Sequence, residues 1–358
     1  MQQRRFATAA LAAVVLLSLA GGCSSGGSSS STTSGSSSSS SAAGNSSGQK
    51  VVAFSQEGLE NDWRTENTQS IMKSLQDAGY KVIYQQADGD QARQVEQVQN
   101  MLQQKPDILV VEPAEAQAAT PIAQLAEKAG VPLVVADRSL GVDPDPNTMY
   151  KVLITQNWTD MGTKLGQAAV NLLTKVNGSA KGNIVELVGV LGSSPQIAMD
   201  AGFKAVIEKY PDIKILDAQD GQNQRAPGQQ IMEDYLTRYP AGQIDMVWAQ
   251  NDEMGLGALK AIQNAGRTEL SGRIISKDGQ IEAIQQVAQG VFATVCTNTP
   301  YFGPIILPYV QDILAGKSVP TSPDKPFTCF ESITEQGQKD AKAQFDELTA
   351  AGAKFANR

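Results

Sequence analysis

Short apolar segments alternate with amphipathic segments along most of the chain, and this alternation restricts the possible folds more than any other feature. The apolar segments are rich in Val, Ile and Leu, as expected of strands buried on both faces. In the first half, strands are predicted at 51–55, 81–86, 107–111 and 132–136, and helices at 64–78, 92–104 and 116–129. Such an alternation predicts a parallel sheet with helices on both faces.

The same alternation returns in the second half. Helices are predicted at 157–176, 196–210, 228–239 and 253–265, and strands at 183–188, 213–217, 245–249 and 273–276. The segment 80–116 parallels the segment 213–254, and after the next strand each half places an aspartate, Asp137 and Asp278. The repetition predicts two similar α/β lobes, whose polar carboxyl edges line a cleft. The alternative is that any two α/β halves resemble each other to this degree.

The first residues have the composition of an export signal. An apolar run over 6–20 follows two arginines, and it is short for a membrane span and typical of a signal peptide. The small residues before Cys23 resemble the lipobox of bacterial lipoproteins, which implies cleavage after residues 1–22 and acylation of Cys23. An ordinary signal peptide with an incidental cysteine is the alternative.

A tether is expected to follow the acylated cysteine. Residues 24–48 are nearly all Ser, Gly, Thr and Ala, a composition that cannot offset the entropy of ordering. We therefore expect 23–48 to be a disordered tether between a lipid anchor and a folded body on the outer face of the cell membrane.

Composition argues against several classes of function. A net charge of −8 is unfavourable for binding nucleic acid. The chain has no histidine, which removes the usual catalytic triads and the commonest metal ligand. No P-loop, dinucleotide fingerprint or cysteine-pair metal motif is present. We expect a protein that is not an enzyme and that uses neither a metal nor another cofactor.

Polar side chains follow the predicted strands at the ends where open α/β sheets bind ligands. Together they offer a hydroxyl, amides, carboxylates, guanidinium groups and an aromatic ring. Polyols need such directional donors and acceptors, with an apolar surface for their C–H groups. A surface loop and ion pairs that cap the sheet are the alternative, and Asp252 is expected to cap a helix. The candidate ligand-binding residues are Ser55, Asn61, Trp63, Arg64, Asp137, Arg138, Asn251 and Asp278.

Four of these segments carry a family resemblance. The sequences VVAFSQEGLENDWR, VPLVVADRS, VWAQNDEMGLGALKAIQNAG and KDG resemble those of the ribose- and galactofuranose-binding proteins of bacterial sugar ABC importers, and the similarity covers about 50–330. The resemblance implies a type I periplasmic-binding fold, in which two doubly wound parallel-sheet lobes are joined by a hinge of three crossings. It implies an N-terminal lobe of 49–155 plus 298–326 and a C-terminal lobe of 156–297 plus 327–358, with an added helix near the C-terminus.

The resemblance also implies a function and further site residues. The chain is expected to be a monomer that binds a monosaccharide or sugar alcohol by lobe closure and delivers it to an ABC permease and its ATPase. Asn223 stands where relatives contact the sugar through an aromatic ring, and Met199 stands where they have an arginine. Thr297 or Asn298 occupies the last hinge position, where the ribose binder has a glutamine, and Asn298 is taken as the candidate. These departures favour a different solute shape, such as an acyclic polyol. A chemosensory receptor, or a glycosidase that uses Asp137 and Asp278, is the alternative.

Two cysteines remain once Cys23 is assigned to a lipid. In an oxidising compartment Cys296 and Cys329 can pair. In the resembling fold their segments lie near each other beside the lobe junction, which implies a disulfide. Two buried free thiols are the alternative.

Overall fold

The computed structural model describes residues 48–323 and 325–357. The predicted signal peptide, the acylated Cys23 and the tether up to residue 47 lie outside these ranges. The described residues belong to one compact unit. Within the described part of the chain, no helix combines the length and the apolar character needed to cross a membrane.

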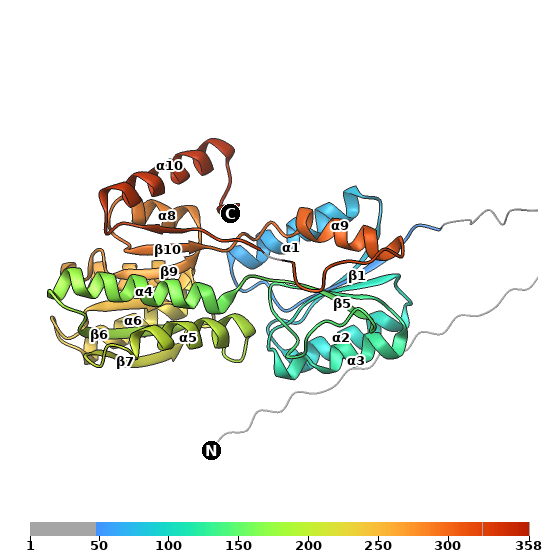
Figure 1. The fold of residues 1–358 in the computed structure, drawn as a ribbon, viewed down its shortest axis with the longest axis horizontal. Helices are drawn as coiled ribbons and strands as arrows, with labels where there is room; N and C mark the ends of the chain where they lie inside the picture. Colours follow the sequence, from blue (N-terminus) through green and yellow to red (C-terminus); the bar gives the residue numbers. More distant parts are fainter. Residues whose placement is uncertain (1–47, 324, 358) are drawn as a thin grey trace, which may run out of the picture. The chain divides into compact units, whose positions relative to one another are not determined.

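The first lobe is built on a five-stranded parallel sheet in the order β2-β1-β3-β4-β5. Helices α1 and α9 cover one face, and α2 and α3 cover the other (Figure 1). The elements are β1 (Val51–Gln56), α1 (Asp62–Asp77), β2 (Lys81–Gln86), α2 (Gln91–Gln103), β3 (Ile108–Glu112), α3 (Pro121–Ala129), β4 (Leu133–Ala136), β5 (Tyr150–Ile154) and α9 (Gly303–Leu314).

The second lobe has a six-stranded sheet in the order β11-β10-β9-β8-β6-β7, in which only β11 is antiparallel to its neighbour. Helices α4 and α5 pack on one face, and α6, α7 and α8 pack on the other. The elements are α4 (Trp158–Asn177), β6 (Gly182–Val188), α5 (Ser194–Ile207), β7 (Ile213–Asp220), α6 (Arg225–Arg238), β8 (Met246–Ala249), α7 (Asp252–Asn264), β9 (Ile274–Asp278), α8 (Ile281–Ala288), β10 (Thr294–Thr297), β11 (Cys329–Glu331) and α10 (Glu335–Ala351).

The two sheets repeat one topology. The order β7-β6-β8-β9-β10 reproduces β2-β1-β3-β4-β5, so the predicted echo between the halves corresponds to equivalent elements. The predicted fold class, two doubly wound α/β lobes, is confirmed. In both sheets the chain passes from the first strand, β1 or β6, to the neighbour on one side and later to the neighbour on the other side. Polar loops follow the carboxyl ends of the strands at this point, as in other doubly wound sheets.

Three segments pass between the lobes. Residues 155–157 join β5 to α4, residues 298–302 join β10 to α9, and the stretch 315–328 leads from α9 to β11. The last stretch first runs beside β5, where the Leu153 backbone N–H donates to the Thr321 carbonyl at 2.8 Å. The lobe boundaries expected from the resemblance, at 155/156, 297/298 and 326/327, stay a prediction.

The structure differs from the predicted elements in a few places. The helix predicted at 116–129 is broken into a 3-10 turn, Gln117–Ala119, and α3, because Pro121 lacks an N–H and begins a new helix. Strand β5 and helices α8 and α9 were not predicted. Helix α9 is apolar over most of its length and contains Pro308, a residue that normally argues against a helix interior.

The disulfide prediction is confirmed. Cys296 and Cys329 are direct partners in the antiparallel β10–β11 pair and are covalently bonded, with their Cα atoms 3.9 Å apart. The bond ties together the strand that leaves the second lobe and the strand that returns to it. The added C-terminal helix is also present, as α10, and it packs on α8.

Candidate ligand-binding site

A cavity lies between the carboxyl ends of the two sheets. The space between its atoms, including the part that opens to solvent, is about 410 Å³, a size that suits a small solute. Nine predicted residues line it: Asn61, Trp63, Arg64, Asp137, Arg138, Asn223, Asn251, Asp278 and Asn298. The cavity surface is therefore built by both halves of the chain, as the matched strand ends predict.

Two asparagines beside the cavity cap the N-termini of helices, one in each lobe. The Asn61 Oδ1 accepts from the Arg64 backbone N–H at 2.8 Å and caps α1, while the Asn251 Oδ1 accepts from the Met254 backbone N–H at 3.0 Å and caps α7. The Nδ2 groups of both asparagines donate to the carbonyl of Asn223, each at 3.0 Å. Since Asn61 belongs to the first lobe and Asn223 to the second, this carbonyl also joins the lobes.

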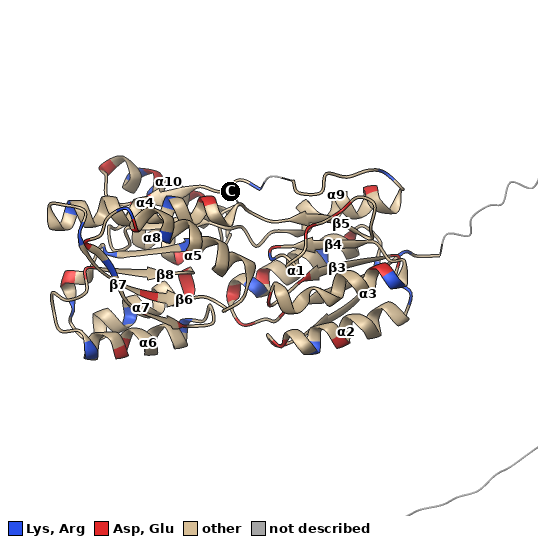
Figure 2. Ribbon diagram, turned by 60° about the horizontal axis from the view of Figure 1, so that its bottom comes forward, with Lys and Arg blue, Asp and Glu red and all other residues tan. Residues whose placement is uncertain are grey.

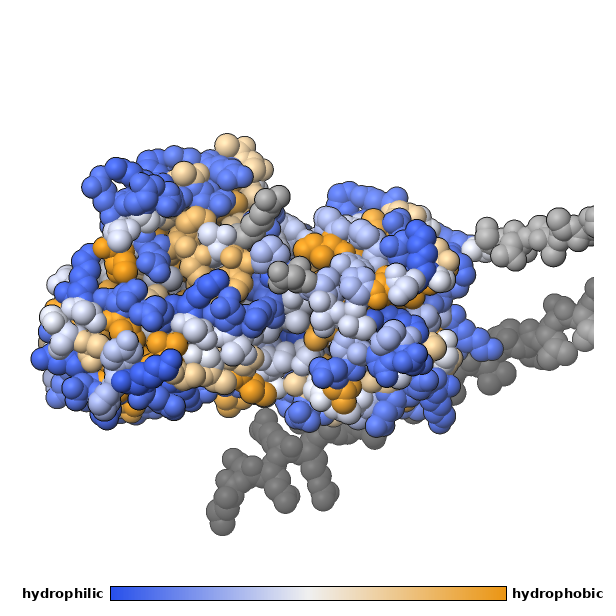
Figure 3. All heavy atoms as spheres, viewed as in Figure 1, coloured by the Kyte–Doolittle hydropathy of each residue, from blue (hydrophilic) through white to orange (hydrophobic). Residues whose placement is uncertain are grey.

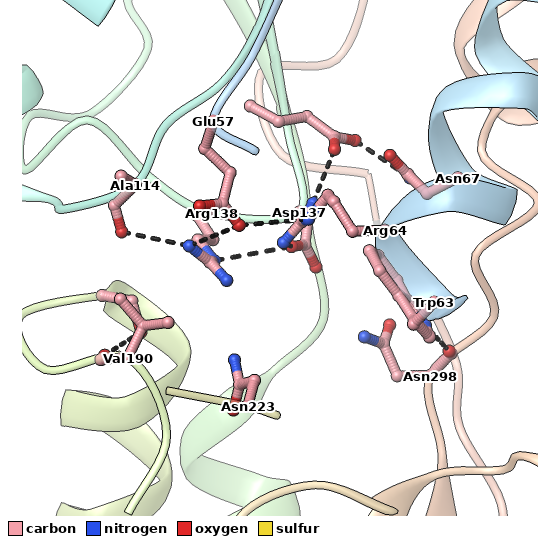
Figure 4. A network of polar contacts seen from close by, with 12 residues as sticks. Glu57, Trp63, Arg64, Asn67, Ala114, Asp137, Arg138, Val190, Asn223 and Asn298 are labelled. Carbon is pink, nitrogen blue, oxygen red and sulfur yellow. Dashed lines mark hydrogen bonds and ion pairs between the residues drawn. The ribbon is translucent and has the colours of Figure 1, made fainter. Parts of the chain in front are cut away.

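Arg64 is surrounded by carboxylates at the edge of the first sheet (Figure 4). Its NH1 donates to Glu112 at 2.7 Å, its NH2 donates to Asp137 at 2.9 Å, and its Nε lies 3.1 Å from Glu57. Burial alone would lower the pKa of Arg64, but these three carboxylates raise it well above the usual value. The guanidinium therefore stays charged and fixes the orientation of Asp137 beside the cavity.

Arg138 forms a second paired cation next to it. Its NH1 lies 2.9 Å from the Glu57 Oε1 and donates to the Ala114 carbonyl at 3.2 Å. In Figure 2, positive and negative residues lie together beside α1, between the two sheets. Burial raises the pKa of Glu57 to about 7, against the opposing effect of Arg138.

The two aspartates predicted as a matched pair have different electrostatic environments. Burial favours the neutral form of Asp137, but Arg64, Arg138 and Lys277 outweigh it and lower the pKa of this carboxyl group. For Asp278 burial wins and raises the pKa, although Lys277 opposes it. Asp137 is therefore the more firmly ionised acceptor of the two.

Asp278 has a strained backbone conformation that places its side chain at the cavity. Its φ is +134°, which breaks the alternation of side chains along a strand, and both Lys277 and Asp278 line the cavity. The Lys277 Nζ donates to the Asp278 Oδ1 at 2.7 Å. Asp137 also has a positive φ, of +60°, at the equivalent place after β4.

Trp63 and Asn298 close the side of the cavity nearest the crossings. The Trp63 Nε1 donates to the Asn298 carbonyl at 2.5 Å, and the indole packs edge-on against Phe302 with ring centres 6.1 Å apart. The Trp63 ring is thereby held in place as an apolar surface of the cavity.

Two expectations about individual residues need correction. Ser55 does not line the cavity: it is fully buried at the end of β1, where its Oγ accepts from the Gln94 Nε2 at 3.2 Å. Asp252 does not cap α7, because Asn251 does so; the Asp252 carboxylate accepts from Ser276 and from the Gln280 backbone N–H instead.

Half of the cavity lining was not predicted. Two of these residues carry a sequence signal: Lys277 directly precedes a candidate aspartate, and Gln250 directly precedes a candidate asparagine. Most of the others also follow the carboxyl ends of strands, after β1 or after β6, and their small, apolar or isolated polar side chains did not mark them as candidates. Met199, within α5, stands where the resemblance places an arginine of the relatives. The additional lining residues are Glu60, Gly189, Val190, Ser193, Pro195, Gln196, Met199, Gln250 and Lys277.

The site is suited to binding and shows no metal-binding cluster within residues 48–323 and 325–357. Its charged lining consists of three carboxylates, those of Glu60, Asp137 and Asp278, and three cations, those of Arg64, Arg138 and Lys277. The rest of the lining consists of amide side chains, one indole, Gly189, Ser193 and the apolar Val190, Pro195 and Met199. Such a surface offers directed hydrogen bonds in several directions with balanced charge.

Comparison with known proteins identifies the family. The family model described as "Periplasmic binding protein domain" matches residues 52–318. The chain therefore belongs to the periplasmic binding protein family, and the relatives below are binding proteins rather than enzymes.

Three curated relatives and one solved structure illustrate the similarity. A galactofuranose-binding protein of Escherichia coli is 32% identical over 60% of this chain and 66% of its own length. A ribose import binding protein of Bacillus subtilis is 30% identical over 76% of this chain and 85% of its own. A xylitol-binding protein of Mycolicibacterium smegmatis is 32% identical over 59% of this chain and 57% of its own. A Mycobacterium smegmatis structure in complex with β-D-fucofuranose has a TM-score of 0.73 and 31% identity, covering 84% of this chain and 97% of that one.

Proposed function

We propose that this chain is the solute-binding component of an ABC importer, and that it binds an uncharged monosaccharide or sugar alcohol in the cavity between its lobes. The observation that carries the proposal is the balanced and paired charge of the lining. Asp137 is paired with Arg64 at 2.9 Å, and Asp278 with Lys277 at 2.7 Å. A charged solute would leave one member of such a pair without its partner in a buried site, at a cost of several kcal/mol, roughly 3–5 in comparable cases.

The proposed contacts follow from the chemistry of each group. Asp137 and Asp278 accept hydroxyl protons, while Arg64, Arg138 and the amides of Asn61, Asn223, Asn251 and Asn298 donate to solute oxygens. Trp63 packs against C–H groups. Met199, 1% exposed, adds an apolar surface from the second lobe, which favours a solute with fewer hydroxyls to satisfy on that side.

The names of the relatives support this class of solute. They include galactofuranose-, ribose- and xylitol-binding proteins, whose named solutes are uncharged and polyhydroxylated. We further propose that the protein is exported through the signal peptide at 1–22 and anchored by a lipid on Cys23. The segment 23–48 would tether a monomeric binding unit close to a permease and its ATPase.

Calorimetric titration of the full exported chain tests the proposal. The solutes are D-galactose, D-ribose, L-arabinose, D-fructose and xylitol, with D-galacturonate as a charged control. We expect at least one of the five to bind with a dissociation constant far below about 1 mM, and galacturonate to bind much more weakly than galactose. Binding of galacturonate in preference to all neutral solutes would contradict the proposal.

A further inference from the structure

Asn298, at the crossing between β10 and α9, makes hydrogen bonds through both its backbone and its side chain. Its backbone N–H donates to the Asp278 carbonyl at 3.0 Å, and its own carbonyl accepts from Trp63. Its side-chain amide lines the cavity and has two protein neighbours: the Oδ1 accepts from the Lys325 Nζ at 3.0 Å, and the Nδ2 lies 3.5 Å from the Asp278 Oδ1. The orientation of this amide decides whether the solute meets a donor or an acceptor.

Lys325 is a buried cation outside the cavity. It lies on the returning crossing, is only 6% exposed, and its Nζ sits 4.6 Å from the centre of the Phe302 ring. Isolating an ammonium group from water is costly. Among residues 48–323 and 325–357, Asn298 is the one side chain that accepts a hydrogen bond from Lys325, so this bond needs an explanation in terms of function or specificity.

The ammonium group restricts the amide to one orientation. A protonated lysine has three donors and no acceptor, so only the oxygen of the amide can face it. The Asn298 Nδ2 is thereby turned toward Asp278 and the cavity. We infer that Lys325 is a positioning residue, which acts through Asn298 to make this amide a hydrogen-bond donor to the bound solute; this inference rests on the proposed function of the cavity.

The disulfide keeps the two crossings close enough for Lys325 to reach Asn298. Cys296 lies two residues before Asn298, and Cys329 lies four residues after Lys325. Between the disulfide and the Lys325–Asn298 contact, the Thr297 backbone N–H donates to the Thr328 carbonyl at 2.7 Å. The covalent bond and the short ladder therefore keep Lys325 facing Asn298.

A pH titration can show whether Lys325 orients the Asn298 amide or only fills space beside it. Burial lowers the pKa of Lys325 to about 7, with Asp137, Asp278 and Glu112 acting to raise it and Lys277 to lower it further. Above that pH the neutral amine can also accept a hydrogen bond, and the amide is no longer restricted. The side-chain amide signals of Asn298, followed by NMR without any solute, should therefore shift with a midpoint near pH 7.

The NMR experiment has a matched control. Lys325→Met should abolish this shift, whereas Lys317→Met, at an exposed lysine of the same returning segment, should leave it unchanged. The other groups that titrate nearby, including Glu57, remain in both variants. An Asn298 titration that persists in Lys325→Met would overturn the inference. Unfolding temperatures verify that the variants fold, and Lys325→Gln replaces Lys325→Met if the latter does not.

A double-mutant cycle on affinity tests the functional part. Calorimetry would use whichever of D-galactose, D-ribose, L-arabinose, D-fructose and xylitol binds the wild type most tightly. Asn298→Ala and Lys325→Met should each weaken binding about tenfold or more, and the double variant should bind no more weakly than Asn298→Ala alone, within about twofold. Losses that multiply would show that Lys325 acts independently of Asn298 and overturn the inference. If none of the five solutes binds the wild type, the proposed function fails, whereas the NMR result still decides whether Lys325 orients the amide.

Discussion

Asp137 and Asp278 show how a single residue type serves equivalent places in two lobes. Each follows or ends the fourth strand of its sheet, and each has a positive φ, a conformation that costs about 1–3 kcal/mol for a residue other than glycine. In both lobes this backbone turn brings a carboxylate to the cavity. The neighbouring cations then differ, so the two acceptors are electrostatically distinct although their positions match.

Replacing either aspartate should weaken solute binding, and replacing Asp137 should also lower the stability of the fold. Asp137→Asn and Asp278→Asn should each weaken solute binding by about 1.5–3 kcal/mol, because each removes a charged acceptor. Asp137→Asn should also lower the unfolding temperature, since Arg64 loses a buried ionic partner at 2.9 Å. Calorimetry and thermal unfolding measure the two effects. Asp107→Asn, at the opposite end of the sheet beside exposed Lys50, is the control for affinity. Unchanged affinity in both cavity variants would contradict the proposed contacts.

Glu186 predicts a pH dependence of stability. This buried carboxyl group at β6 accepts from the Gln250 Nε2 at 2.7 Å, and burial, with a smaller effect of Asp200, raises its pKa from 4.5 to about 8 despite Lys204. Because the folded pKa is the higher one, its contribution is complete below about pH 4.5 and is lost as the pH rises through about 8. Glu186→Gln keeps the acceptor but cannot ionise. Its unfolding temperature relative to the wild type should therefore rise between about pH 5 and about pH 8.5. A difference that is constant over this range would contradict the assignment.

At the scale of elements, sequence pattern predicts the parallel strands well and the irregular parts poorly. The buried strands β1, β3 and β4 begin with continuous apolar runs, and polar residues after β1 and β4 line the cavity. Strand β5 is harder to predict because it follows a proline-rich segment and carries Lys151 in its interior. The loop before α5 follows the carboxyl end of β6, the counterpart of β1, but its glycines and apolar residues lack the polar groups by which candidates were chosen.

The segment after α10 connects the second lobe to the first. Its backbone pairs with the region beside Asp278: the Ile281 N–H donates to the Lys354 carbonyl at 2.8 Å, and the Ala356 N–H donates to the Gly279 carbonyl at 2.9 Å. Phe355, 1% exposed, inserts into the apolar cluster of the first lobe that includes Trp63 and Phe302. The segment is therefore a noncovalent addition to the three covalent crossings.

Phe355→Ala should be strongly destabilising. Removing a fully buried aromatic ring typically costs about 3–5 kcal/mol, and the loss here falls on a cluster that supports Trp63. Denaturant unfolding monitored by circular dichroism measures it. Lys354→Ala removes only the half-exposed ion pair with Glu66 and should cost about 1 kcal/mol or less. Equal effects of the two substitutions would show that Phe355 does not anchor the segment.

At the scale of the whole molecule, the lobes meet through direct contacts besides the crossings. The Ala116 backbone N–H donates to the Gly192 carbonyl at 3.0 Å, and the Ser139 backbone N–H donates to the Ser194 Oγ at 2.8 Å. The Asn61 amide reaches the Asn223 carbonyl at 3.0 Å. The face in Figure 3 is largely hydrophilic, with scattered small apolar patches rather than one continuous apolar surface. Two lobes joined by short crossings and by polar contacts of this kind are expected to move as hinged bodies.

Lobe closure is the last prediction, and Ser194 offers a way to test it without altering the cavity. Ser194 contacts Ser139 across the lobes but does not line the cavity, so Ser194→Ala removes a contact that holds the lobes together and no proposed solute contact. If solute binds only the closed form, a smaller closed population lowers the apparent affinity by the same factor. One lost neutral hydrogen bond of about 1 kcal/mol corresponds to roughly a fivefold weaker affinity.

Small-angle scattering should show compaction of the wild type on saturation with the tightest-binding of the five neutral solutes. Ser194→Ala should reach the same compact form only at higher solute concentration. An exposed serine on the same lobe, Ser179→Ala, should behave as the wild type. A radius of gyration that is unchanged at saturation, together with wild-type affinity in Ser194→Ala, would instead indicate a rigid preformed pocket.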